Sequence, residues 1–136
     1  MNDLFRRIKD FNKDRLPDMI KLKYEFMAEN VFRFYRGTCH LFYEDISKAY
    51  YLPGSPPCWI SGDLHLENFG SFKSDNKQVY FDLNDFDEAA LAPATWELTR
   101  LLTSIFIAFE SLKIQEKRAM KMASLFLKTY SATLIK

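Results

Sequence analysis

Hydrophobic residues recur at helical spacing toward both ends of this chain and alternate at strand spacing in its middle. Residues 1–51 carry the first helical patterns, and we expect helices over residues 3–12, from Pro17 onward, and from His40 to Tyr50. Pro17 suits a helix start because the first turn does not need its missing N–H group. The expected buried stripe of the second helix consists of Met19, Ile20, Tyr24 and Met27.

Two longer amphipathic helices are predicted over residues 95–135. The apolar face of the first consists of Leu98, Leu101, Leu102, Ile105, Phe106, Phe109 and Leu112. The second covers about residues 114–134, and its inward positions are Ala119, Met122, Ala123, Phe126, Leu127, Tyr130 and Leu134. Its pattern ends without a glycine or another helix-stop residue, so we expect a domain that is incomplete within residues 1–136.

The central segment, residues 58–88, combines a short apolar run with two acidic clusters, residues 62–68 and residues 82–87. The run at residues 58–60 predicts a buried strand. Apolar side chains alternate on either side of the turn residues 74–77, which predicts a β-hairpin over residues 69–81. We expect residues 89–93 to form a loop. The predicted fold class is therefore α+β and mostly helical, in a single domain.

Composition narrows the class of protein. A chain of 136 residues with 48% apolar residues, including 13 Phe, is long enough to bury a core. The net charge of +1 gives no reason to expect a nucleic-acid or anionic-membrane partner. Cys39 and Cys58 lie far apart without a CxxC pattern and are interpreted as reduced core thiols. No apolar run suits a membrane span or a signal peptide, so we expect a cytoplasmic location.

The two acidic clusters carry the candidate chemistry. Because a hairpin returns the chain to its starting point, the prediction places Asn68 next to Asp85, with Asp63 close to both. Oxygen ligands of this kind suit Mg²⁺, which takes one or two carboxylates and completes its shell with water and phosphate oxygens. A carboxylate beside the ion could orient a hydroxyl for attack on a phosphoryl group. Arg36, a charge among aromatic residues, is interpreted either as a structural ion pair or as a phosphate or carboxylate clamp.

Both clusters match known motifs. Residues 61–68, SGDLHLEN, resemble the catalytic loop of aminoglycoside phosphotransferases and choline kinases, whose pattern is His-Gly-Asp-x-His-x-x-Asn. Ser61 stands where those families usually have His. Residues 84–87, NDFD, resemble the metal-binding segment of the same protein-kinase-like fold. The spacing also agrees, since Asp is followed by Asn five residues later, then by a hairpin, then by Asp.

A second resemblance covers nearly the whole chain. The motifs FYRG, GDLHLENFG, FDLNDFDE and WELTRL occur in that order and resemble the bacterial family called domain of unknown function 2252. That family more often has Asp at the position of Glu97 and Pro at the position of Thr95. The resemblance implies that Glu97 supports the catalytic loop, and this is one of the positions at which the chain departs from the family.

The resemblance implies the catalytic, C-lobe-like half of a protein-kinase-like fold, with a short β-hairpin between the catalytic and metal loops. It implies Mg²⁺-dependent phosphoryl transfer from ATP to an unknown small-molecule or protein hydroxyl acceptor. Asp63 would be the catalytic base, Asn68 and Asp85 would hold Mg²⁺, and Asp87 would assist a second metal ion. The residues implied to support the loops or pair with phosphate are His65, Arg36, Arg100 and Glu97.

Part of a kinase-like site is missing from the sequence. There are four glycines and no GxGxxG motif, and no lysine-bearing strand for the ATP phosphates is visible. Members of the resembled family are longer, so we expect a fragment that is inactive alone and whose partner is the missing remainder of the domain. One alternative is a non-catalytic kinase-like binding module or truncated remnant. A further alternative is a metallophosphoesterase, because residues 63–65 match Asp-x-His, although the later motifs of that class are absent.

Overall fold

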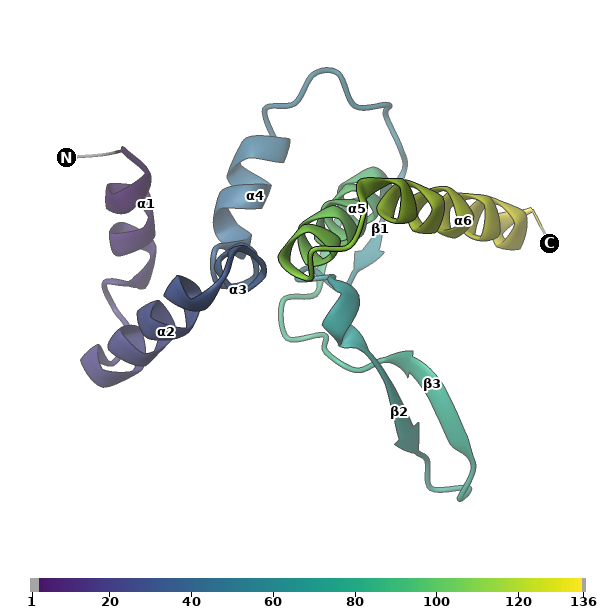
Figure 1. The fold of residues 1–136 in the computed structure, drawn as a ribbon, viewed down its shortest axis with the longest axis horizontal. Coiled ribbons are helices and arrows are strands. Elements are labelled where there is room, and N and C mark those ends of the chain that lie inside the picture. Colours follow the sequence, from purple (N-terminus) through teal and green to yellow (C-terminus); the bar gives the residue numbers. More distant parts are fainter. Residues whose placement is uncertain (1–2, 136) are drawn as a thin grey trace. The chain divides into compact units, whose positions relative to one another are not determined.

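The computed structural model describes residues 3–135 (Figure 1). The protein is 59% helical, with six α-helices and two small antiparallel sheets among the described residues, which confirms the α+β class. The chain divides into two compact units, residues 1–55 and residues 56–136. The division falls inside the proline-rich segment that follows the N-terminal helices.

The first unit is built from helices in its described part. They are α1 (Asp3–Asn12), α2 (Pro17–Glu29), α3 (Val31–Gly37) and α4 (Cys39–Ile46). The helices predicted over residues 3–12 and from Pro17 are confirmed. Their shared core consists of Ile8, Met27 and Leu41, with Tyr24 and Phe34 packed against it.

Two expectations for this unit are wrong. Helix α4 ends at Ile46, and Tyr50 is 97% exposed rather than part of a continuing helix. The helix ends because the Ser47 hydroxyl donates a hydrogen bond back to the carbonyl of Glu44 and the following residues wind into tighter turns. Met19 is 55% exposed, since α2 turns Met27 rather than Met19 toward the other helices.

The second unit contains two antiparallel strand pairs and two long helices. Strand β1 (Pro57–Ile60) pairs with β4 (Ala90–Pro93), and β2 (Phe69–Lys73) pairs with β3 (Val79–Leu83). The short 3-10 helix η1 (Leu66–Asn68) leads directly into β2, and the long helices are α5 (Ala94–Ser111) and α6 (Glu116–Leu134). The predicted hairpin is confirmed, and its strands extend away from α5 and α6 (Figure 1).

Three predictions about the strands and cysteines need correction. Residues 90–93 form β4 instead of a loop, because the backbone groups of β1 need a partner and find it there. Strand β1 buries only Ile60; Trp59 is 77% exposed and lies opposite Leu91, which is exposed too. Cys58 is likewise exposed and is not a core thiol, whereas Cys39 is partly buried.

The core of the second unit lies where α5 meets α6 and the first acidic cluster. Its buried residues are Leu64, Leu101, Ile105 and Ala119. Helix α6 reaches this core through the small residues Ala119 and Ala123, which narrows the stripe that it buries. The predicted inward positions Met122, Leu127 and Leu134 of α6 are therefore exposed. Leu112, predicted on the apolar face of the preceding helix, is exposed too, because α5 ends at Ser111. Within residues 3–135, no helix has the length and apolar character that a membrane crossing requires.

Candidate functional site

The two acidic clusters lie in facing loops between two strand pairs. We call this unpaired interval the opening. Residue Ile60 pairs with Ala90 at one end of the opening, and Phe69 pairs with Leu83 at the other. Residues 61–68 and residues 84–89 fill the interval between these two strand pairs. Because antiparallel pairing joins these two segments at both of their ends, the two acidic clusters run alongside each other.

Two close backbone contacts hold the clusters together inside this opening. The Asn84 N–H donates to the Asn68 carbonyl oxygen at 3.0 Å, so Asp85 follows directly after the residue bonded to Asn68. At the other end, Gly62 has a φ of 89°, and a Cβ there would lie 2.1 Å from the Glu88 carbonyl oxygen. Only glycine fits this conformation and this close approach. The first cluster is therefore in contact with the second near both of its ends.

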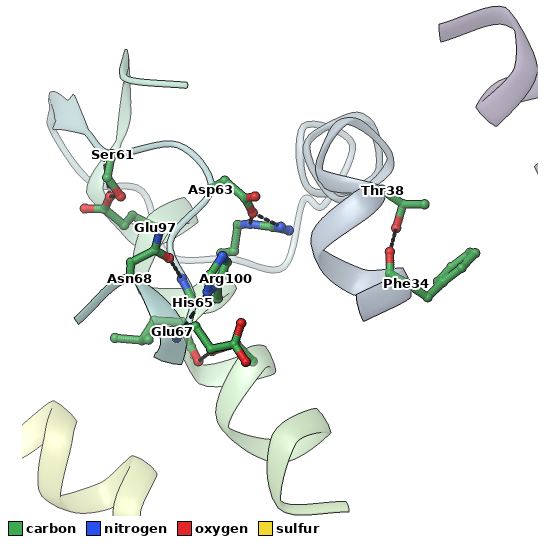
Figure 2. Close-up of polar contacts among 11 residues, drawn as sticks. Phe34, Thr38, Ser61, Asp63, His65, Glu67, Asn68, Glu97 and Arg100 are labelled. Carbon is green, nitrogen blue, oxygen red and sulfur yellow. Dashed lines mark hydrogen bonds and ion pairs between the residues drawn. The ribbon is translucent and has the colours of Figure 1, made fainter. Parts of the chain in front are cut away.

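Asp63 is held by a buried arginine (Figure 2). Arg100, on α5, is fully buried, and its Nε donates to Asp63 Oδ1 at 3.0 Å. The Nη2 group of Arg100 donates to the same oxygen. The Asp63 side chain keeps 24% of its surface exposed, and Oδ2 takes no part in these bonds. The neighbouring Leu64 is packed in the core, so the backbone beside Asp63 is anchored as well.

A second residue of α5 holds the start of the same loop (Figure 2). Glu97 Oε1 accepts the backbone N–H of Ser61 at 2.5 Å and the Ser61 hydroxyl at 2.7 Å. Glu97 and Arg100 are three residues apart and therefore project from the same side of the helix. Helix α5 therefore bonds to the loop at positions 61 and 63.

His65 and Asn68 brace the loop from within. The Asn68 side-chain oxygen accepts the backbone N–H of His65 at 2.7 Å, and His65 Nδ1 accepts the backbone N–H of Glu67 at 3.2 Å. These bonds form a reciprocal cap at the start of η1. His65 is 1% exposed and Asn68 is 3% exposed. An Nδ1 that accepts a hydrogen bond places the ring hydrogen of neutral His65 on Nε2.

The second cluster presents exposed carboxylates. Asp85 Oδ1 accepts the backbone N–H of Asp87 at 3.3 Å, a local turn that fixes the Asp85 side chain. No three His, Cys, Asp or Glu side chains gather into a possible metal site anywhere in residues 3–135. The carboxylates of Asp85 and Asp87 are of the donor type that Mg²⁺ prefers, whereas the Asn68 side-chain oxygen already accepts the His65 N–H and has one acceptor position left.

Arg36 lies in the last turn of α3, within the first unit. Its pairing with loop carboxylates or phosphate stays a prediction.

Sequence reasoning missed several residues that shape the opening. Ser61, Asn84 and Glu88 were not identified as site residues, yet each contacts the opposite cluster or α5. Two of these contacts involve only backbone atoms of the missed residue, which leave no signal in the side-chain pattern. The signal that the sequence did offer is Gly62, since a glycine can mark a close approach of two backbone segments.

The chain belongs to a family of uncharacterised proteins conserved in bacteria, domain of unknown function 2252, whose model matches residues 15–136. Neither the curated proteins nor the solved structures give a significant match. The match confirms the resemblance that was based on the four motifs. It begins after α1, so that helix lies outside the matched residues.

Proposed function

We propose that residues 56–135 carry the catalytic loop and the metal loop of a kinase-like phosphotransferase. The complete protein would transfer a phosphoryl group from ATP to a hydroxyl acceptor, with Mg²⁺ as cofactor. One observation carries the proposal: the two acidic clusters lie alongside each other in a single opening, in contact through Gly62 and Glu88 and through Asn68 and Asn84.

Each residue of the opening has a proposed role in this reaction. Asp63 would orient the acceptor hydroxyl and take its proton on Oδ2, while Arg100 holds Oδ1 and keeps the carboxylate in one orientation. Asn68, Asp85 and Asp87 would hold Mg²⁺, which would neutralise charge on the transferring phosphoryl group. Glu97 and His65 would keep the loop in place without touching the substrate.

The proposed reaction also needs groups that hold the triphosphate. The sequence has no GxGxxG motif, which kinase-like enzymes use over the ATP phosphates. We therefore expect the 136-residue chain alone to bind Mg²⁺-ATP weakly and to transfer no phosphoryl group. Tight binding of Mg²⁺-ATP by this chain in isothermal titration calorimetry, lost in Asp85→Ala, would contradict this part of the proposal.

The metal-loop assignment can be tested without any enzyme assay. Mn²⁺, a paramagnetic substitute for Mg²⁺, is titrated into the isotope-labelled chain, and amide signals are followed by NMR. We expect broadening centred on Asn68 and Asp85, and its loss in Asp85→Asn. Asp75→Asn is the matched control, because it removes the same charge from the exposed hairpin turn, at the far end of the hairpin from Asn68 and Asp85. Equal broadening at the hairpin turn, or an equal loss in the control, would show unspecific binding and contradict the assignment.

One observation favours a second function, that of a non-catalytic binding module. The Asp63, Asn68 and Ser61 side chains each form a structural hydrogen bond within the second unit. Loops rich in Asp, Asn and Gly form such bonds for local reasons alone. A chain in which Mn²⁺ broadens no signal near Asp85 would support this function instead.

A further inference from the structure

His40 forms a contact between two helices of the first unit. Its ring, on α4, stacks on the Phe11 ring of α1 with centroids 3.8 Å apart and planes inclined by 2°. Both ring nitrogens are inaccessible to solvent, and neither has a hydrogen-bond partner among the described residues. The imidazole ring is therefore packed as an apolar ring would be. This packing favours the neutral form, because a charged ring would bury two N–H groups without acceptors.

Burial and three nearby cations oppose a proton on His40, and one carboxylate favours it. The guanidinium of Arg15 lies 5.2 Å and the ammonium of Lys23 lies 5.6 Å from the centre of the same Phe11 ring. Burial of the ring, and the cations Lys23, Arg7 and Arg15, lower the pKa of His40 from its ordinary value, while Glu44 acts in the opposite direction.

Glu44 is the acidic group that favours a charged His40, and its carboxylate is already paired with Arg7. It stands one turn along α4, and its carboxylate accepts the Nε of Arg7 at 2.8 Å. Arg7 also pairs with Asp45 at 2.9 Å, so the acidic end of α4 is occupied by a cation from α1. The groups facing His40 are then Arg7 from α1, Lys23 from α2, Arg15 from the α1–α2 connection and Glu44 from its own helix.

We propose that the docking of α1 onto α4 depends on pH: neutral His40 holds α1 through the Phe11 stack, and protonation of His40 releases it. Release would uncover Met27 and Leu41, which pack against Ile8 of α1 in the docked state. Helix α1 precedes the residues matched by the family model, so the device would be an addition to the family segment of this chain.

The direction follows from proton binding. The docked state binds fewer protons on His40 than the released state, whose pKa is near about 6.5. Docking is therefore strongest above about pH 6.5 and weakens as the pH falls below that value.

Hydrogen exchange on the full chain tests the proposal. Mass spectrometry measures the protection factors of residues 3–12 at about pH 7.5 and about pH 5.5, on either side of the ordinary histidine pKa. We expect the protection factors to fall several-fold at the lower pH, because the docked state takes up the proton on His40 less readily than the released state does. Peptides from α5 serve as the internal reference, since no change is expected there.

His40→Phe is the decisive variant, because phenylalanine keeps a flat ring for the stack and cannot titrate. We expect its α1 protection to be the same at both pH values. An equal loss in wild type and in His40→Phe would overturn the proposal.

An NMR titration of the two histidines provides a second measurement that needs no variant. We expect the His40 ring signals to titrate below the ordinary value of about 6.5. A His40 pKa at or above that value would overturn the proposal, even if the phenylalanine variant failed to fold.

Discussion

The two units of this chain place their charged side chains differently. In residues 56–135, Arg100 is fully buried and bonded to Asp63 in the first acidic loop. In residues 3–55, the ion pairs of Arg7 with Glu44 and Asp45 lie at the surface, and the buried polar side chains are the uncharged Asn12 and Thr38. Burying a charge costs free energy unless its partners are well placed. The second unit buries a charge where it fixes the geometry of a loop, whereas the first unit keeps the charges of these ion pairs in contact with water.

The largest expected effect comes from the close approach in the opening. Gly62→Ala combines a left-handed backbone with a Cβ 2.1 Å from the Glu88 carbonyl oxygen. Backbone strain and overpacking together should lower the free energy of unfolding of the second unit by about 4 kcal/mol. Tryptophan fluorescence in urea reports on this unit, because Trp59 and Trp96 both lie in it. Gly70→Ala is the control within the same unit, since a Cβ there would meet only the end of the exposed Asn84 side chain and should cost little. A loss below about 1 kcal/mol in Gly62→Ala would mean that the two clusters are not in contact.

The next effect concerns the buried charge. Asp63→Ala removes the carboxylate that accepts two N–H groups of the buried Arg100. We expect a loss of about 3 kcal/mol, at the low end for a buried pair because Asp63 is partly exposed. The same fluorescence measurement applies. Asp75→Ala, in the exposed hairpin turn, should change stability by no more than about 0.5 kcal/mol. Similar losses in the two variants would remove the distinction between buried and surface charge.

A smaller effect is expected for the second support of the loop. Glu97→Ala removes the acceptor of both Ser61 donors, and the expected loss is about 1–3 kcal/mol. A double-mutant cycle with Ser61→Ala isolates the hydroxyl contribution, since the backbone N–H persists in that variant. We expect measurable coupling between the two positions. Purely additive effects would show that the Ser61 hydroxyl does not bond to Glu97 in solution.

The smallest effect is expected in the first unit. Arg7→Gln removes the surface pairs with Glu44 and Asp45, and those carboxylates raise the pKa of Arg7. Water and salt screen exposed pairs strongly, so the change should be less than for any variant above. Hydrogen exchange of α1 at low and high ionic strength measures it. If the wild type loses no α1 protection in high salt, the pairs make no contribution to docking.

The sequence correctly predicted the elements in which apolar residues recur at a clear helical or strand spacing. The α1 and α5 patterns and the alternating residues of the β2–β3 hairpin appear in the structure close to their expected bounds. Strand β4 was missed because Ala90 to Pro93 contains no β-branched or aromatic residue. Its pairing with β1 is a tertiary contact that no local pattern indicates. Trp59 and Cys58 were expected to be buried because they are apolar, but a two-stranded pair leaves most of its surface exposed.

The candidate site could be predicted only in part. The hairpin alone indicated that Asn68 and the residues around Asp85 would lie close together, because antiparallel strands return the chain to its start. The roles of Arg100 and Glu97 came from motif resemblance, since helical periodicity cannot tell which loop a side chain will reach. The close approach of Gly62 to Glu88 involves backbone atoms of residues far apart in the sequence, so only the three-dimensional structure could show it.

The β2–β3 hairpin has a consequence for variation within this family. The bond between the Asn68 carbonyl and the Asn84 N–H closes the hairpin at its base, while the turn at residues 74–78 lies at the far end. Strand side chains alternate between two faces. Adding or deleting one residue in one strand would therefore reverse the face of every residue between that change and the acidic loops. Matched additions of two residues to both strands would preserve the register at Asn68 and Asn84. Natural relatives should therefore differ in hairpin length by pairs of residues, with the acidic loops unchanged.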